Sequence, residues 1–215
     1  MIPKAFITAW QKKAPWQDDT QVEQDLIIER SLIEIYSDPF LKDKLAFRGG
    51  TALHKIFLSP AARYSEDIDL VQITAEAFGP VIDKIRERLD FMSRPVVKQK
   101  KNNNTLVYRF ESETGIPAKL KIEINCREHF TLYGLQTVDL STESEWFSGT
   151  AQIPTYDLTE LLGTKMRALY QRRKGRDLFD LYYAITKGNA NTDRIVAAWK
   201  HYMTEEGNSV SQAEY

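Results

Sequence analysis

Residues 63–71 read Arg-Tyr-Ser-Glu-Asp-Ile-Asp-Leu-Val, and this stretch decides the expected fold. The pattern is typical of a loop that runs into a strand. On a strand, Asp67 and Asp69 share one face while Ile68 points into the core. Two neighbouring carboxylates repel each other and are usually stabilised by a cation, and oxygen ligands favour Mg²⁺ or Mn²⁺ over Zn²⁺. Taken alone, the pair also fits ordinary surface or turn residues.

A two-metal site for phosphoryl or nucleotidyl transfer needs a third carboxylate on a neighbouring strand. Residues 119–125, KLKIEIN, alternate between polar and apolar side chains, which predicts a half-buried strand with one polar face. Glu123 lies on that face and is the candidate for the third metal ligand. The alternative is that Glu123 is a solvated strand residue.

Upstream, the sequence from Phe47 to Thr51 predicts a strand that ends in a glycine turn, followed by a helix over 52–58. Gly49, Gly50 and Thr51 would then leave free backbone N–H groups at the start of a helix, where they favour a phosphate, and the Thr51 hydroxyl would add a hydrogen bond. The alternative is a tight turn in which Thr51 only caps the helix. The spacing is neither that of a Walker A loop nor that of a dinucleotide fingerprint.

A basic cluster lies near the C-terminus. Its members are Lys165, Arg167, Arg172, Arg173, Lys174 and Arg176. From a helix, Lys165 could reach a triphosphate, and the arginines could hold polyphosphate or an RNA backbone. Asp177 and Asp180 follow and share one helix face because they are three residues apart. The alternative is a solvated basic face whose cations pair with these two aspartates.

The rest of the pattern predicts the elements and their division into domains. Apolar spacing predicts helices over 19–37, 75–93, 157–172, 176–186 and 192–203 and a strand over 105–111. The basic run 98–104 is predicted as a turn and residues 139–153 as polar, irregular chain. We place the domain boundary in this irregular stretch, which gives one domain over 1–150 and a helical region over 151–215.

Composition excludes several classes of protein. The chain has 215 residues, with 29 Lys and Arg against 30 Asp and Glu and a formal net charge of −1. It is therefore not a polycation that binds nucleic acid by bulk charge, so contact with RNA requires a local basic patch. The single cysteine, Cys126, excludes an internal disulfide and indicates a reducing compartment. Without a membrane-spanning run or a signal peptide, we expect a cytoplasmic protein.

Four short motifs occur in order across about residues 45–185. They are Gly49-Gly50-Thr51-Ala52-Leu53, Arg63-Tyr64-Ser65-Glu66-Asp67-Ile68-Asp69, Lys165 with Arg173, and Arg176-Asp177-Leu178-Phe179-Asp180. Together they resemble the AbiEii/AbiGii-type nucleotidyltransferase toxins of the DNA polymerase β-like nucleotidyltransferase superfamily. The resemblance implies an α+β fold, with a small mixed-sheet nucleotidyltransferase core, flanking helices and a helical C-terminal region that completes the active-site cleft.

The resemblance also implies roles for single residues. Asp67 and Asp69 would hold the metals, Lys165 would neutralise the phosphates of the nucleotide, and Asp177, or else Asp180, would be the acid of the fourth motif. The implied phosphate-binding residues are Gly49, Gly50, Thr51, Arg63, Ser65, Lys165 and Arg173. Arg63 is alternatively a structural partner of the acids. Glu123 departs from the pattern, because polymerase-β-like relatives often have Asp as the third acid.

We therefore expect a Mg²⁺-dependent (or Mn²⁺-dependent) nucleotidyltransferase toxin of a toxin–antitoxin or phage-defence system. The resemblance implies transfer from an NTP to an RNA acceptor, the tRNA 3′ end in relatives, with an antitoxin as partner and no membrane contact. Two alternatives stay open: transfer of NMP to a protein hydroxyl, and a non-catalytic NTP-binding module of the same fold. The fold alone does not choose the acceptor.

Overall fold

The computed structural model describes residues 2–100 and 102–207, and the chain forms two compact units. The first unit spans Met1–His129 and Thr137–Thr155, and the second spans Phe130–Gln136 and Tyr156–Tyr215. The predicted domain boundary after residue 150 stays a prediction, since compactness alone does not establish that either part folds by itself.

A seven-stranded mixed sheet runs through the first unit in the order β3-β4-β5-β2-β1-β7-β6. The strands are β1 (Leu45–Arg48), β2 (Asp67–Gln72), β3 (Val96–Lys100), β4 (Asn103–Glu111), β5 (Pro117–Asn125), β6 (Leu135–Glu143) and β7 (Ser148–Tyr156). β2 is antiparallel to β1 and parallel to β5, while β1 is parallel to β7. β2 therefore lies at the centre of the sheet, between the strand that precedes the glycine turn and the KLKIEIN strand.

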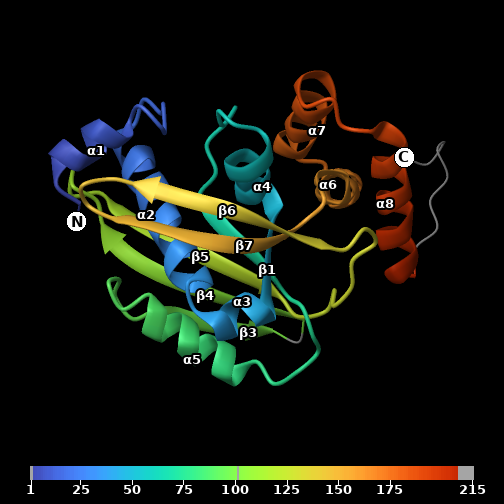
Figure 1. The fold of residues 1–215 in the computed structure, drawn as a ribbon, viewed down its shortest axis with the longest axis horizontal. Coiled ribbons are helices and arrows are strands. Elements are labelled where there is room, and N and C mark those ends of the chain that lie inside the picture. Colours follow the sequence, from blue (N-terminus) through green and yellow to red (C-terminus); the bar gives the residue numbers. More distant parts are fainter. Residues whose placement is uncertain (1, 101, 208–215) are drawn as a thin grey trace. The chain divides into compact units, whose positions relative to one another are not determined.

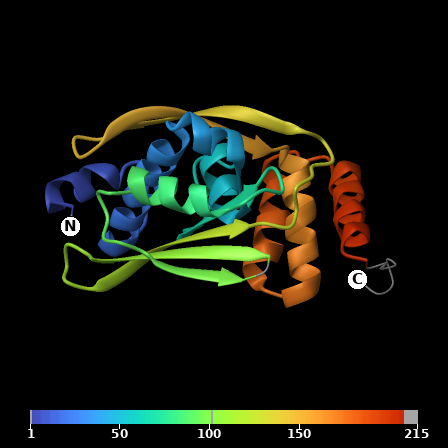
Figure 2. The same ribbon diagram turned by 90° about the horizontal axis from the view of Figure 1, so that it is seen from below.

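The helices of the first unit pack around one long helix. They are α1 (Lys4–Trp10), α2 (Asp19–Tyr36), α3 (Pro39–Lys44), α4 (Gly49–Ala52), the π-helix η1 (Leu53–Phe57) and α5 (Gly79–Arg88). Most of the 18 residues of α2 are buried. Figures 1 and 2 show the reason: the sheet curves around α2, with β3–β5 on one side of the helix and the β6–β7 hairpin on the other.

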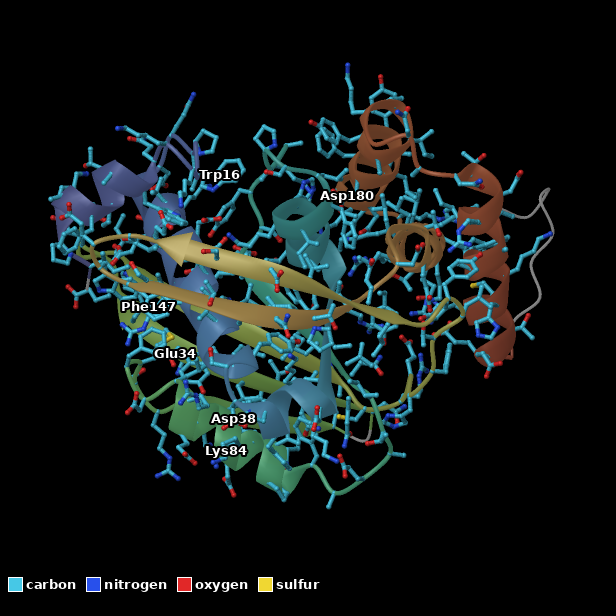
Figure 3. All side chains as sticks on the ribbon, in the orientation of Figure 1. Trp16, Glu34, Asp38, Lys84, Phe147 and Asp180 are labelled. Atoms are coloured by element: carbon cyan, nitrogen blue, oxygen red, sulfur yellow. The ribbon has the colours of Figure 1, made fainter. Side chains whose placement is uncertain are left out.

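An arginine attaches the turn of the β6–β7 hairpin to α2. The guanidinium of Arg30 lies 3.9 Å from the ring centroid of Phe91, 4.9 Å from that of Trp146 and 5.1 Å from that of Phe147, which Figure 3 labels. Cation–π contacts of this kind strengthen when they are shielded from water. Trp146 is therefore a packing anchor at the turn of the hairpin.

Most predicted elements are confirmed. The helix over 19–37 is α2, which begins after the side-chain cap of Asp18. The strand over 119–125 belongs to β5, in which Leu120, Ile122 and Ile124 are fully buried, so the predicted alternation holds. The helix after the glycine turn begins at Gly49 and continues as the π-helix.

The prediction of irregular chain over 139–153 is wrong, because most of these residues form the β6–β7 hairpin. Along β7, Ala151, Ile153 and Thr155 are buried while the residues between them are less so. A hairpin with one face toward solvent has polar residues at every second position. Because of these polar residues, the segment was predicted to be irregular chain and not two strands.

Two further corrections concern the ends of elements. The basic run 98–104 is a turn only in part: Asn102 is a turn residue, but Lys98 to Lys100 lie in β3, Asn103 and Asn104 lie in β4, and Lys100 pairs with Asn103. Residue 101 of the run lies outside the described residues. The helix predicted over 75–93 is the shorter α5, which begins at Gly79 with Pro80 in its first turn.

The described residues of the second unit form three helices and a short preceding loop. α6 (Leu158–Arg172), α7 (Gly175–Lys187) and α8 (Thr192–Glu205) confirm the three predicted helices. The buried carboxylate of Glu160 in α6 accepts hydrogen bonds from the hydroxyls of Thr131 and Tyr202 and from the backbone N–H groups of Leu132 and Tyr133, all at 2.8–2.9 Å. Glu160 thereby binds the loop and α8 to α6. Among the described residues, no helix is long and apolar enough to cross a membrane.

Candidate active site

Two neighbouring strands carry three carboxylates on one face of the sheet. In β2, Ile68 is fully buried in the core, so Asp67 and Asp69 project from the opposite face. β5 runs parallel to β2, with Asp67 opposite Lys121 and Asp69 opposite Glu123. The register therefore brings Asp67, Asp69 and Glu123 onto the same face, as the alternation predicts. Their roles in catalysis stay predictions.

Gly49 leaves room for one of these carboxylates. Its φ is +83°, a conformation that side chains other than glycine rarely adopt. A Cβ atom at this position would lie 2.0 Å from Oδ2 of Asp69. Both the turn and the position of the Asp69 carboxylate therefore require glycine here.

The hydroxyl of Thr51 links the glycine turn to the start of β2. Thr51 is buried, and its Oγ1 donates to the backbone carbonyl of Asp67 and lies 2.7 Å from Oγ of Ser65. Because a hydroxyl has only one proton, Ser65 must be the donor in the contact with Thr51. These bonds fix the two motifs to each other. Phosphate binding by Gly49, Gly50, Thr51 and Ser65 stays a prediction.

Arg63 and Tyr64 lie in the loop before β2. Nη1 of Arg63 donates to the backbone carbonyl of Tyr64 at 3.0 Å. The ring of Tyr64 packs edge-on against Trp16, with ring centroids 5.9 Å apart. Both predicted roles of Arg63, as a phosphate ligand and as a structural partner of the acids, stay open.

Lys121 supplies a positive charge among the three carboxylates. Its Nζ forms an ion pair with Glu123. Burial alone would lower the pKa of Lys121, but the bond to Glu123 and the charges of Asp67 and Asp69 outweigh burial and raise it. Lys121 is therefore charged at neutral pH, and the carboxylate of Glu123 is engaged.

Asp67 has a perturbed protonation equilibrium. Burial raises the pKa of Asp67 to about 6. The negative charges of Asp69, Glu66 and Glu123 also raise this pKa, whereas the positive charge of Lys121 lowers it. A cation bound beside Asp67 would favour the ionised carboxylate and lower this pKa. The site therefore favours binding of a positive charge next to Asp67.

The donor atoms suit Mg²⁺ or Mn²⁺. Within the part of the chain that the structure describes, no group of three or more His, Cys, Asp or Glu side chains converges to hold a metal. Mg²⁺, however, is commonly held by one or two carboxylates, with water and substrate phosphates as the other ligands. Asp67 and Asp69 fit such a site, whereas Glu123 could join it only if its pair with Lys121 opened.

A cavity of about 290 Å³ opens beside Asp69 and Glu123. Its other lining residues are Arg48, Leu70, Asn102, Asn103, Asn125 and Arg127. Arg48 and Arg127 both form ion pairs with the buried Glu128, which restrains their guanidinium groups at the cavity wall. A metal-bound polyphosphate is bound by carboxylates, which hold the metal, and by arginines, which hold the phosphates. The cavity has both kinds of side chain in its wall.

Three residues of this region were not predicted from the sequence: Arg48, Lys121 and Arg127. A signal for Lys121 was present, because strand alternation places it on the same face as Glu123. Arg48 could have been found from its position directly before the glycine turn. Arg127 lies beyond the end of β5, and only the fold brings it to the cavity.

The second unit contains a buried cluster of ion pairs. Nζ of Lys165 lies 3.3 Å from Oδ1 of Asp177 and 3.1 Å from Oδ2 of Asp180, which Figure 3 labels. Arg172 donates to both oxygens of Asp177, at 2.8 and 2.9 Å. Burial alone would raise the pKa of Asp177, but Arg172 and Lys165 outweigh it and lower the pKa. The cations thus pair with the aspartates, as one of the two hypotheses held, in a buried rather than a solvated cluster.

The predicted site residues belong to both units. The first unit contains Gly49, Gly50, Thr51, Arg63, Ser65, Asp67, Asp69 and Glu123, and the second contains Lys165, Arg173 and Asp177. Arg173 is exposed and ends α6 in the left-handed conformation, with a φ of 50°. A common role of the two sets in one reaction stays a prediction.

Comparisons with known proteins identify a matching family and a similar fold. Residues 30–215 match the model of the family described as nucleotidyl transferase AbiEii toxin, type IV TA system. MenT4, a nucleotidyltransferase toxin from Mycobacterium tuberculosis, is similar in structure, with a TM-score of 0.66 and 17% sequence identity over 98% of this chain and 75% of that chain. This similarity confirms the predicted class of fold.

A second solved structure, an antigenic nucleotidyltransferase-like protein from Paracoccidioides brasiliensis, is 14% identical over 87% of this chain and 96% of that chain, with a TM-score of 0.49. No curated protein matches the chain.

Proposed function

The chain belongs to the AbiEii family of nucleotidyltransferase toxins, and from this membership we propose that it transfers a nucleotide from an NTP to a hydroxyl of RNA, the tRNA 3′ end being the expected acceptor. The observation that carries the proposal is the register of β2 and β5. It places Asp67, Asp69 and Glu123 on one face of the sheet, beside a cavity with two arginines in its wall. Membership in a toxin–antitoxin family also implies an antitoxin as partner.

Asp67 and Asp69 are the proposed metal ligands. Mg²⁺ or Mn²⁺ bound there would neutralise charge on the nucleotide and prepare the acceptor hydroxyl for attack on the α-phosphorus. Gly49 contributes by leaving space for the carboxylate of Asp69. Asp67 contributes by losing its proton, since only the ionised carboxylate binds a cation well.

Arg48, Arg127 and Lys121 are the proposed phosphate-neutralising residues of the first unit. Arg48 and Arg127 are held by the same carboxylate, so their charges are in place before a nucleotide binds. Such preorganised charge stabilises the negative charge that develops on the phosphates during transfer. For Lys165 and Arg173 we keep the roles that the family motifs imply, neutralisation and binding of nucleotide phosphates.

Transfer of a labelled α-phosphate tests the proposal. The protein is incubated with each α-labelled NTP, Mg²⁺ and total bacterial tRNA, and RNA and protein are then separated. We expect the label on RNA only. Label on polypeptide would replace RNA by a protein hydroxyl as the acceptor, and equilibrium binding of NTP without any transfer would favour the non-catalytic module.

A further inference from the structure

α7 has two faces of opposite character. Asp177, Asp180, Leu181 and Ala184 are buried and form its inner face. The outer face exposes large apolar and aromatic side chains: Leu178, Phe179, Tyr182 and Ile185, with exposed fractions of 57%, 38%, 65% and 40%. So large an apolar surface on one short helix is typical of a binding site.

Two aromatic rings on this helix are already stacked. The rings of Phe179 and Tyr183, one turn apart, have centroids 5.9 Å apart and planes that differ by 22°. Tyr182 stands beside them as the most exposed of the large apolar side chains. The outer face of α7 therefore presents flat π-surfaces, and not only aliphatic area.

The exposed charged side chains of the segment 171–187 are all positive. Between residues 171 and 187 the exposed ionisable side chains are Arg172, Arg173, Lys174, Arg176 and Lys187. The two acids of the segment, Asp177 and Asp180, are fully buried and neutralised by Lys165 and Arg172. In a chain of net charge −1, this is a local basic patch of the kind that contact with RNA requires.

We propose that the outer face of α7 and the α6–α7 turn bind the unpaired end of the acceptor RNA, with bases stacked on Tyr182 and Phe179 and phosphates held by Lys174 and Arg176. This inference deepens the proposed function and rests on it for the identity of the acceptor. Single-stranded nucleic acid is recognised by aromatic rings that stack on bases and by cations that follow the backbone. A protein partner could also bury these rings, but it would need acidic side chains against the basic patch and would bury Leu178 and Ile185 together with the rings, which the first test below distinguishes.

The first test separates stacking from simple apolar contact. Binding of a short fluorescein-labelled single-stranded RNA is measured by anisotropy for Tyr182→Ala and Tyr182→Phe, with Leu178→Ala and Ile185→Ala as matched controls on the same face. Loss of one base–ring stack weakens binding by about 5- to 150-fold. We expect this loss for Tyr182→Ala only, with Tyr182→Phe and the two aliphatic variants close to wild type. The three side chains that are changed are exposed, so folding should be retained, and circular dichroism checks this.

The second test distinguishes the contribution of the aromatic rings to RNA binding from that of the basic side chains. For single-stranded nucleic acid, the slope of log affinity against log salt changes by about 0.7 for each phosphate that a cation of the protein no longer neutralises. Lys174→Gln should lower the magnitude of the salt slope by about this amount, while Tyr182→Ala should lower affinity and leave the slope unchanged.

Three outcomes would overturn the inference. They are no RNA binding by the wild-type protein, undiminished binding by Tyr182→Ala, and equal losses for Tyr182→Ala, Leu178→Ala and Ile185→Ala. Undiminished binding would show that RNA does not stack on Tyr182 and binds elsewhere on the protein. The binding assay uses neither NTP nor Mg²⁺, so it is independent of nucleotide transfer. Ring-dependent RNA binding without any transfer would contradict the proposed function but would support RNA binding at this face.

Discussion

Gly49 is the residue at which the geometry of the site is most easily disturbed. Gly49→Ala would place a methyl group 2.0 Å from Oδ2 of Asp69 and hold alanine at a φ of +83°. The backbone conformation alone costs about 1–2 kcal/mol for a residue with a side chain. We expect a lower melting temperature and loss of nucleotide transfer, because the carboxylate of Asp69 must move. Gly79→Ala is the control, since nothing lies within 4 Å of its new Cβ atom; equal activity of the two variants would contradict the role of Gly49.

Asp67 gives the site a testable pH dependence. In the metal-free protein its carboxyl carbon should titrate by ¹³C NMR with a midpoint at about pH 6. The folded pKa lies above the unfolded value of about 3.9, so the stability contributed by Asp67 is fully present below about pH 4 and is lost as pH rises through 6. The free energy of unfolding of Asp67→Asn should therefore increase relative to that of wild type as pH rises from 4 to 8. Saturating Mg²⁺ should lower the midpoint, and a midpoint that Mg²⁺ does not shift would contradict metal binding at Asp67.

At the scale of elements, a buried ion-pair network connects the helix after the glycine turn to α2. Nζ of Lys55 in η1 lies 2.9 Å from Oδ2 of Asp25 and 2.8 Å from Oε1 of Glu29. Burial alone would lower the pKa of Lys55, but the two carboxylates outweigh it and raise the pKa. Trp10 donates to Asp25, and Thr142 of β6 donates to Glu29. Four elements therefore depend on these charges.

Lys55→Met should destabilise the protein strongly, because it leaves two carboxylates buried without their cation. Breaking such a buried pair by removing one partner costs about 3–5 kcal/mol. The free energy of unfolding in urea measures this loss. Lys84→Met in α5 is the control, and we expect little change there because its partner Glu87 is exposed. Equal midpoints of the two variants would show that the network does not stabilise the fold.

A comparison of single elements shows how much of the fold could be predicted from the sequence. KLKIEIN could be recognised as a strand because one of its faces is apolar throughout, and the Asp67–Asp69 pair followed from the same alternation. The β6–β7 hairpin could not, since its buried positions include Thr142, Thr155 and Ala151 and lack a strong apolar signal. α2 was predicted from its apolar spacing, but only the structure shows that its buried Asp25 and Glu29 are paired with Lys55. Pairings between distant segments are not encoded in local periodicity.

At the scale of the whole molecule, the net charge of −1 conceals an uneven distribution of charged side chains. Carboxylates gather on the face of β2 and β5, whereas exposed cations gather around α7. The first arrangement suits a metal and the second suits RNA. The family match over residues 30–215 includes both regions. Net charge alone could not reveal this, because the two regions cancel in the sum.

The central claim is that the carboxylates on the β2 face perform nucleotide transfer, and one comparison tests it most directly. Transfer of labelled α-phosphate to tRNA in Mg²⁺ is measured for wild type, for Asp69→Asn and for Asp83→Asn, an exposed aspartate of α5. We predict full transfer for wild type and Asp83→Asn and none for Asp69→Asn, although that variant remains folded by circular dichroism. Undiminished transfer by folded Asp69→Asn would contradict the account and place the reaction elsewhere in the molecule.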